Sequence, residues 1–202
     1  MNAPTRDLKA KVWKRDDLDW YREPSGVSAA LFRVERFGGH IWDPACGAGS
    51  IVEAAARAMA GRAHAGSDIK QRVDRWWHLG EIDFLTTTEA FGENVVCNPP
   101  FGSGKLAEAF IRHALALASG KVAMFVDTRF LSGAKRAATL YVEHRPHRIW
   151  LLSPRPSCPP GEWLAAGNKA GGGTADYAWI VWDKLAPAAT VTDLGWLSWG
   201  RE

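Results

Sequence analysis

The stretch DPACGAG, residues 43–49, stands between a short apolar run that ends at Asp43 and an alanine-rich run over 50–60. The apolar run, 40–43, predicts a strand, and the alanine-rich run predicts a helix. Glycine suits the turn between them, because the missing Cβ lets the backbone come close to a ligand. The stretch therefore predicts the opening strand, turn and helix of a βαβ unit, with a ligand near the turn.

The spacing of the glycines excludes two common phosphate-binding motifs. A dinucleotide fingerprint, GxGxxG, needs a third glycine at position 52, where the chain has Val52. A P-loop ending at Lys105 needs its first glycine where Pro99 stands, and no serine or threonine follows the lysine. Phosphate is therefore not the expected ligand of either glycine-containing stretch.

Strand-like and helix-like segments alternate outward from this stretch. Strands are predicted over 40–43, 63–68, 81–83, 94–98, 122–127, 147–152 and 177–182, and helices over 25–37, 50–60, 70–79, 105–119 and 132–143. A Pro/Gly-rich loop fills 153–173, and no helix separates the last two strands. The pattern predicts an α/β, Rossmann-like, doubly wound mixed sheet of about seven strands, with the last strand antiparallel.

Length and composition fit one domain. The chain has 202 residues, of which 47% are hydrophobic and 23% charged, as in ordinary globular proteins. We expect an N-terminal arm over 1–22 and a single domain over 23–202. Cys46, Cys97 and Cys158 form no CxxC pair, so neither a metal site nor a disulfide is expected. A charged N-terminus and the lack of long apolar runs predict a cytoplasmic protein without a membrane partner.

Acidic residues close the second and third predicted strands. Asp68 stands about twenty residues after the glycine turn, where a carboxylate accepts hydrogen bonds from ribose hydroxyls. Asp83 is positioned to accept from an adenine amino group, and the ring of Phe84 to flank the base. Asp43 is positioned to face an ammonium group. Together these residues predict a ligand that contains a nucleoside.

The run Asn98-Pro99-Pro100-Phe101 directly follows the apolar residues 95–97. Two consecutive prolines end a strand, remove two hydrogen-bond donors and stiffen the turn. The turn then offers two acceptors, the Asn98 side-chain oxygen and the Pro99 carbonyl, followed by an aromatic plane. This arrangement suits a flat substrate that carries an amino group.

DPACGAG, the two strand-end acids and NPPF together resemble the motifs of amino-group DNA methyltransferases of the class I fold, especially the N6-adenine type. The motif order is similar to that of type I modification subunits and small phage-borne enzymes. The sequence Tyr21-Arg22-Glu23-Pro24 resembles the cofactor-contacting segment of that group, which usually ends Thr-Pro, although Glu23 replaces the threonine. The strand over 176–182 also resembles the phage-borne members, and the resemblance spans roughly 20–183.

The resemblance implies S-adenosyl-L-methionine as the cofactor and adenine in DNA as the substrate. Only about twenty residues follow the last predicted strand, which is too few for the separate target-recognition domain that restriction-linked relatives usually carry, so we expect none. The implied catalytic residues are Asn98, Pro99, Pro100 and Phe101. The implied cofactor contacts are Tyr21, Pro24, Asp43, Pro44, Ala45, Cys46, Gly47, Gly49, Asp68, Ile69, Asp83, Phe84 and Asn98. In duplex DNA the adenine must leave the base stack before it is methylated.

The basic residues of the second half suggest where nucleic acid binds. Residues 102–202 carry 12 lysines and arginines against 8 acids, and seven of these basic residues fall within 129–169. A local basic excess suits a polyanion, so we expect this segment to form the nucleic-acid face. The expected substrate contacts are Phe101, Gly102, Arg129, Arg155 and Lys169.

Three other functions remain compatible with the motifs. RNA adenine methyltransferases also carry NPPF, whereas release-factor glutamine methyltransferases typically have NPPY and a larger N-terminal domain. A non-catalytic S-adenosylmethionine-binding module is the third alternative. The intact Asn98, Pro99 and Phe101 favour an enzyme.

Overall fold

A computed structural model describes residues 18–200 and contains one eight-stranded sheet. The strands are β1 (Ile41–Asp43), β2 (Ala65–Asp68), β3 (His78–Glu81), β4 (Asn94–Cys97), β5 (Lys121–Asp127), β6 (Arg148–Ser153), β7 (Tyr177–Asp183) and β8 (Asp193–Ser198). Their order across the sheet is β3-β2-β1-β4-β5-β7-β6-β8. β7 runs antiparallel to β5 and β6, and the other neighbouring pairs are parallel.

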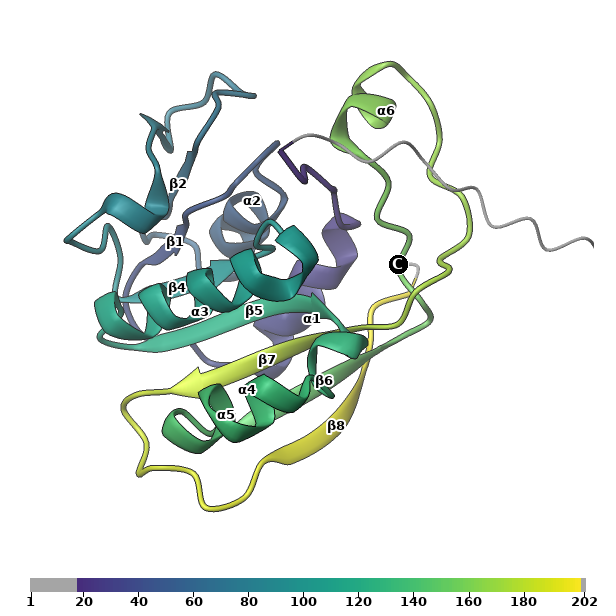
Figure 1. Cartoon of the computed structure of the whole chain (residues 1–202). Coiled ribbons are helices and arrows are strands. Elements are labelled where there is room, and N and C mark those ends of the chain that lie inside the picture. The colour runs from purple at the N-terminus through teal and green to yellow at the C-terminus, as the bar shows by residue number, and fades with distance from the viewer. Residues whose placement is uncertain (1–17, 201–202) are drawn as a thin grey trace, which may run out of the picture.

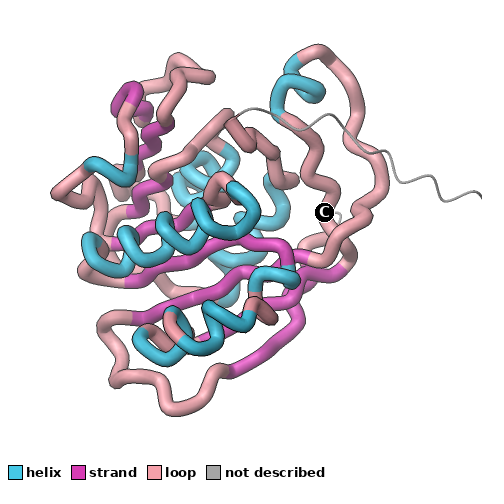
Figure 2. The backbone as a smooth tube through the Cα atoms, in the orientation of Figure 1, coloured by secondary structure: helices cyan, strands magenta, loops and turns pink. Residues whose placement is uncertain are grey.

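Helices cover both faces of this sheet (Figure 1, Figure 2). They are α1 (Ser25–Val34), α2 (Ser50–Ala58), α3 (Lys105–Leu117), α4 (Ala134–Ala138), α5 (Leu140–Glu143) and α6 (Gly161–Ala165), with 3₁₀ turns η1 (Phe84–Thr86), η2 (Gly102–Gly104) and η3 (Thr128–Phe130). One core lies between the sheet and α1 and α2, and a second lies between the sheet and α3 and α5.

The two cores explain why the central strands are apolar between their polar end residues. In β4, Val95 and Cys97 contribute to the core beneath α3, whereas Val96 contributes to the core beneath α1 and α2. A strand that is buried on both faces has no polar side, so its sequence does not alternate. The predicted doubly wound mixed sheet is confirmed, including the antiparallel course of β7.

The predicted helix over 70–79 is wrong, because residues 69–77 form a loop. Trp77 is 4% exposed and packs with Cys46 and Val52 under the glycine turn. The burial of this large ring outweighs the helical pattern of the segment. The third strand accordingly begins at His78, earlier than the predicted 81–83, and Asp83 lies two residues beyond its end.

The C-terminal third departs from the prediction in three places. β8 adds an eighth strand beside β6, in parallel register from Arg148↔Asp193 to Ser153↔Ser198. The loop over 153–173 contains the short helix α6, and the predicted helix over 132–143 is divided at Thr139 into α4 and α5. β8 escaped prediction because its pairing partner is distant in sequence and most of its residues are exposed.

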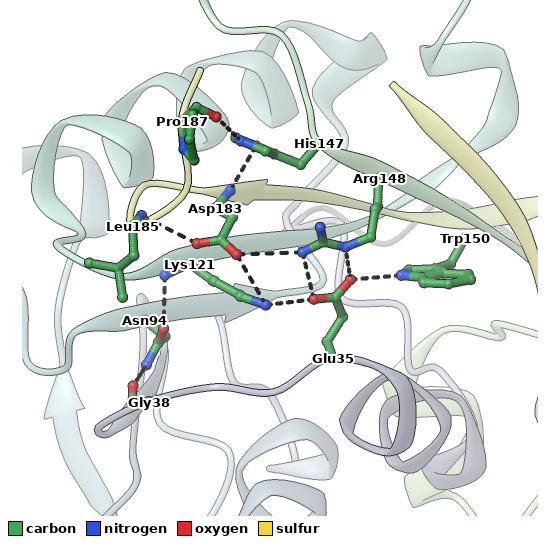
Figure 3. A network of polar contacts seen from close by, with 10 residues as sticks. All are labelled: Glu35, Gly38, Asn94, Lys121, His147, Arg148, Trp150, Asp183, Leu185 and Pro187. Carbon is green, nitrogen blue, oxygen red and sulfur yellow. Dashed lines mark hydrogen bonds and ion pairs between the residues drawn. The ribbon is translucent and has the colours of Figure 1, made fainter. Parts of the chain in front are cut away.

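A polar network ties α1 to the edge of the sheet where β5 and β6 begin (Figure 3). Glu35, at the end of α1, is 3% exposed and accepts hydrogen bonds from Arg148, from Lys121 Nζ at 2.8 Å and from Trp150 Nε1 at 3.0 Å. Burial opposes ionisation of Glu35, but these donors outweigh it and lower its pKa. Asp183, at the end of β7, also pairs with Lys121 and Arg148.

This network corrects one expectation about the basic segment over 129–169. Arg148 is held by Glu35 and Asp183 at the edge of the sheet opposite the carboxyl ends of β1 and β4. A basic excess counted along the sequence therefore does not form one continuous face. The residues that follow the carboxyl ends of β5 and β6 are the ones on the side of Asn98.

Candidate active site

Two cavities adjoin at the carboxyl ends of the parallel strands. The first has a volume of about 300 Å³ and is lined by the chain before α1, the glycine turn, and residues that follow β2, β3 and β4. The second has a volume of about 280 Å³ and is lined by residues around β5, β7 and the NPPF turn. Asp19, Tyr21 and Asn98 line both cavities. The strand order reverses between β1 and β4, which is where such sheets bind ligands.

Most of the residues predicted to contact a cofactor surround the first cavity. Those that line it are Tyr21, Asp43, Pro44, Ala45, Cys46, Gly47, Asp68, Ile69, Asp83, Phe84 and Asn98. Pro24 and Gly49, both in the described part of the chain, are not among its lining residues; Pro24 lies at the start of α1. Gly49 has φ +87°, and the ring of Trp77 fills the space that a Cβ would need. Its glycine identity is therefore explained by packing.

The glycine turn is fastened to the end of β2. Gly47 has φ +50°, and its N–H donates to Asp68 Oδ2 at 2.8 Å. The other carboxylate oxygen, Oδ1, accepts from the Lys70 N–H at 3.1 Å. Asp68 is 6% exposed, so these bonds hold a buried carboxylate against the first cavity.

The end of β3 contributes less than the sequence suggested. Asp83 is exposed and its Oδ1 accepts from the Leu85 N–H at 3.1 Å, which begins η1. Phe84 is 2% exposed, and its ring packs edge-on against Trp42 at a centroid distance of 5.2 Å. The Phe84 ring is thus largely committed to the core. Ile69 is 57% exposed and lines the same cavity, so it offers the more accessible apolar surface.

Asn98 stands at the junction of the two cavities with a fixed orientation. Its Nδ2 donates to the Tyr21 carbonyl oxygen at 2.9 Å and to Glu23 Oε2 at 2.9 Å. Both amide protons are therefore used toward the chain before α1. Among residues 18–200, no hydrogen bond to Oδ1 is found, so this oxygen is available to accept from a ligand.

The rest of the NPPF turn divides between the cavities. Pro100 lines the first cavity, and Pro99 and Phe101 line the second. The Phe101 ring meets Phe130 edge-on at 6.2 Å between centroids, so Phe130 supports it from one side. Gly102 lines neither cavity, and its N–H donates to Asp19 Oδ2 at 2.7 Å. This bond ties the turn to the chain before α1.

The end of the predicted arm forms a wall of both cavities, which sequence reasoning recognised only at Tyr21. Tyr21 pairs with Pro160 as an antiparallel bridge, and the Arg22 N–H donates to the Pro159 carbonyl oxygen at 3.0 Å. The Trp20 carbonyl oxygen accepts from the Gly161 N–H at 2.8 Å. The YREP segment was the signal in the sequence that this part of the chain lies at the site. Its pairing with residues 159–161 joins segments that are distant in sequence, so a local pattern does not show it. The remainder of the arm, 1–17, lies outside the described residues.

The first cavity is rich in acids. Asp19, Glu23, Asp43, Asp68 and Asp83 line it, against the two arginines Arg22 and Arg72. Burial is the main cause that raises the pKa of Glu23 to about 7. Burial, and then the nearby Glu23 carboxylate, raise the pKa of Asp43 well above its usual range. Raised carboxyl pKa values in a cavity favour a cationic ligand, which would stabilise the ionised acids.

Arg72 is another residue that lines the first cavity and that sequence reasoning missed. Its side chain is 6% exposed, lies 3.9 Å from Asp68 Oδ1 and stacks over the Trp20 ring at 4.1 Å from the centroid. Its buried Nε has no hydrogen-bond partner among the described residues. Arg72 lies in the segment that was predicted to be helical, which concealed its place beside Asp68.

The second cavity has an aromatic wall. Phe125 and Tyr177 stack at 4.8 Å between centroids with an interplanar angle of 6°. Asp127, 7% exposed, binds the guanidinium of Arg129, with Arg129 Nε at 2.9 Å from Oδ1 and NH2 at 2.6 Å from Oδ2. Both residues line the cavity. Because Phe125 is 2% exposed and belongs to the core beneath α1 and α2, the half-buried Tyr177 offers the accessible apolar surface, with charge at its rim.

The other residues predicted to contact nucleic acid lie outside both cavities. Arg155 is exposed and pairs with Asp176, Nε to Oδ1 at 2.6 Å. Lys169 is exposed in the loop after α6. Both follow the carboxyl end of β6, on the same side of the sheet as Asn98.

Within the described residues, no group of three or more His, Cys, Asp or Glu side chains is arranged to hold a metal ion. None of the helices between residues 18 and 200 is long and apolar enough to cross a membrane.

Known structures share this architecture. The methyltransferase subunit of a type I restriction-modification system from Streptococcus thermophilus superposes with a TM-score of 0.61 at 15% identity, covering 88% of this chain and 47% of that chain. A candidate RNA methyltransferase from Pyrococcus horikoshii superposes with a TM-score of 0.60 at 14% identity, covering 83% of this chain and 87% of that chain. The chain has the class I methyltransferase fold.

Two further findings show how far this similarity extends. The M protein of the EcoKI type I restriction enzyme superposes with a TM-score of 0.55 at 17% identity, covering 82% of this chain and 44% of that chain. This chain thus spans about half the length of the two type I subunits. At 15% and 17% sequence identity, the similarity establishes the fold alone. No protein-family model and no curated protein sequence matches the chain.

Proposed function

We propose that this chain is an S-adenosylmethionine-dependent methyltransferase that methylates the exocyclic amino group of adenine in DNA. The observation that carries the proposal is the geometry of Asn98, which stands between two adjoining cavities with Nδ2 anchored and Oδ1 free. In this arrangement one cavity can hold the methyl donor and the other the acceptor, with the Asn98 oxygen where they meet.

The first cavity fits the proposed cofactor. S-adenosylmethionine supplies an electrophilic methyl group on a sulfonium centre and also carries an ammonium group. Five acids line the cavity against two arginines, and the cationic groups of the ligand would stabilise the ionised forms of Glu23 and Asp43, whose pKa values burial raises. Asp68 is held by Gly47 and Lys70 with its carboxylate against the cavity, as a ribose acceptor requires.

The NPPF turn supplies what an aromatic amine needs. The amino lone pair of adenine is delocalised into the ring, so the nitrogen is a poor nucleophile. Asn98 Oδ1 and the Pro99 carbonyl accept the two N–H groups and favour tetrahedral geometry, which frees the lone pair. These hydrogen bonds strengthen as the nitrogen becomes cationic, so they stabilise the transition state most.

The proposed reaction needs no dedicated base to remove the proton from the substrate nitrogen. The new N–C bond forms as the S–C bond breaks, and the ammonium product then loses one proton to solvent. Phe101 holds the plane of the base in the second cavity, where stacking of a base on an aromatic ring contributes roughly 1–3 kcal/mol. Holding two reactants in line contributes about 7–11 kcal/mol to lowering the barrier.

DNA is the proposed substrate because the NPPF and DPACGAG motifs resemble those of adenine DNA methyltransferases and because cations flank the second cavity. Arg129 lines this cavity, and Arg155 and Lys169 lie on the same side of the sheet. Cations so placed would contact phosphates around an extruded base, with Arg129 and Arg155 exchanging their ion pairs with Asp127 and Asp176 for phosphate. RNA adenine is the second candidate, since a candidate RNA methyltransferase shares the fold over 83% of this chain.

The test is transfer of tritiated methyl groups from S-adenosylmethionine to separate DNA, RNA and protein fractions, followed by nucleoside analysis. The proposal predicts label in DNA as N6-methyladenine. Label confined to RNA supports the second candidate, and label in glutamine would identify a protein methyltransferase. Cofactor binding by calorimetry without transfer to any fraction would identify a binding module.

A further inference from the structure

The side-chain amide of Asn98 has two orientations that fit the same space, and only one serves the proposed reaction. With Nδ2 toward Tyr21 and Glu23, Oδ1 is free to accept from the substrate amino group. A 180° rotation would place an N–H donor where the substrate also offers donors. Whatever selects the first orientation therefore controls the acceptor on which the proposed function depends.

Glu23 is placed to make this selection. It is 6% exposed, directly precedes Pro24 at the start of α1, and its Oε2 accepts from Asn98 Nδ2 at 2.9 Å. No lysine or arginine within residues 18–200 forms an ion pair with it, and the Arg22 Nε is turned to Ser50 Oγ at 3.4 Å. A buried carboxylate without an ion-pair partner is costly, and the hydrogen bond from Asn98 is one of the contacts that offset this cost, beside the backbone N–H of Glu23 and the charge of Arg22.

We propose that Glu23 is a positioning residue, which rests on the function proposed above: its carboxylate fixes the Asn98 amide so that Oδ1 faces the substrate. An ionised carboxylate only accepts hydrogen bonds. Rotation of the amide would bring Oδ1 against both this carboxylate and the Tyr21 carbonyl oxygen, which is repulsive. Protonated Glu23 would donate instead, and the preference would weaken.

The ionisation state of Glu23 is consequently part of the proposal. Burial raises the pKa of Glu23 to about 7, and the hydrogen bond from its own backbone N–H, the hydrogen bond from Asn98 and the charge of Arg22 oppose that rise, in this order. The groups that face it are Asp43 at the end of β1, Cys97 at the end of β4, Cys158 in the loop after β6, and the neighbouring Arg22. Because ionised Glu23 is the form that fixes Asn98, the ordered amide is favoured as pH rises through this pKa.

The kinetic test compares kcat across pH for the wild type and Glu23→Gln at saturating cofactor. The wild type should lose kcat as pH falls through and below about 7, and Glu23→Gln, which has no proton to gain, should lack this limb. Glu23→Met, of similar size and without an acceptor, should reduce kcat by about 10²-fold, as expected for a misplaced reacting group. The exposed Glu89→Gln is the matched control and should keep the wild-type profile.

A second readout does not depend on turnover. The side-chain amide signals of Asn98, assigned by their loss in Asn98→Ser, should shift with pH in the cofactor-free wild type with a midpoint near 7. They should stay constant over this range in Glu23→Gln. Thermal melts of each variant establish that it is folded before either comparison is made.

The outcomes separate this inference from the proposed function. An acid limb that survives in Glu23→Gln would assign the titration to Asp43 and overturn the role of Glu23. An identical Asn98 titration in wild type and Glu23→Gln would overturn it as well. The wild type could methylate no nucleic acid and still show the Asn98 titration, with its loss in Glu23→Gln. That result would refute the proposed function but support the role of Glu23 in fixing the orientation of the Asn98 amide.

Discussion

The Gly47 N–H donates to Asp68 Oδ2 at 2.8 Å, so one hydrogen bond joins the glycine turn after β1 to the end of β2. Asp68 therefore orders the turn and also lines the first cavity, where it is proposed to hold the ribose. Sequence reasoning assigned it only the second. The bond makes the shape of the cavity depend on the same carboxylate that is proposed to hold the ribose.

Substitution of Asp68 should separate these two tasks. Asp68→Ala should weaken S-adenosylmethionine binding and lower the free energy of unfolding, each by about 1–3 kcal/mol, because buried partners are left unpaired. Asp68→Asn keeps an acceptor for Gly47 and should lose affinity with a smaller loss of stability. Calorimetry and chemical denaturation check both. Wild-type cofactor affinity in both variants would sink the ribose assignment.

Gly49 gives a prediction about packing. At φ +87° an alanine is strained, and its Cβ would also enter the Trp77 ring. Gly49→Ala should therefore lower the free energy of unfolding by about 1–3 kcal/mol. Gly61→Ala is the matched control, since Gly61 has φ +84° with no atom within 4 Å of the added Cβ. Equal losses in the two variants would show that the Trp77 contact adds nothing to the strain.

The Glu35 network should affect stability and leave the site untouched. Glu35→Gln removes the negative charge between Lys121 and Arg148 and should lower the free energy of unfolding by about 3 kcal/mol. This value is at the lower end for breaking a buried ion pair, because Asp183 still pairs with both cations. The pKa of Glu35 in the folded protein lies below its ordinary value of 4.5. The contribution of the ionised side chain to stability is therefore complete above pH 4.5 and is lost as pH falls through the lowered pKa. Denaturation of wild type and variant across pH measures this difference. Altered cofactor affinity at neutral pH would show that the network reaches the site.

Neutralising Arg129, Arg155 and Lys169 together should weaken DNA binding. Each lost phosphate contact should flatten the salt dependence by roughly 0.9 in log–log slope for duplex DNA, without a change in cofactor affinity. A control triple variant of Arg36, Arg57 and Arg145 removes the same charge from exposed positions elsewhere. If both triple variants keep the wild-type slope, or both lose it equally, the nucleic-acid face does not lie beside the second cavity.

The sequence predicted the parts of the fold that local patterns encode. Strand-end acids such as Asp68 follow from topology, because the carboxyl ends of parallel strands meet at one edge. The loop around Trp77 and the strand β8 were missed, because tertiary burial decides the first and long-range pairing with β6 decides the second.

The site was predicted to a similar extent. Besides Asn98, ten of the residues that the family resemblance predicts to contact the cofactor line one cavity. Glu23 was noted only as a departure from a threonine, since its hydrogen bond to Asn98 spans 75 residues of sequence. Arg72 was concealed by the helical pattern around it. Contacts between distant segments are what sequence patterns do not express.

The most direct test of the account is mass spectrometry of nucleosides from DNA incubated with S-adenosylmethionine and either wild type or Asn98→Ala. Calorimetry of the same preparations establishes that both bind the cofactor. The wild type should form N6-methyladenine, and Asn98→Ala should lose about 10²–10³-fold in kcat, comparable to removal of one preorganised polar group. Cofactor affinity should change little. Near-normal formation of N6-methyladenine by Asn98→Ala would contradict the central role given to this side chain.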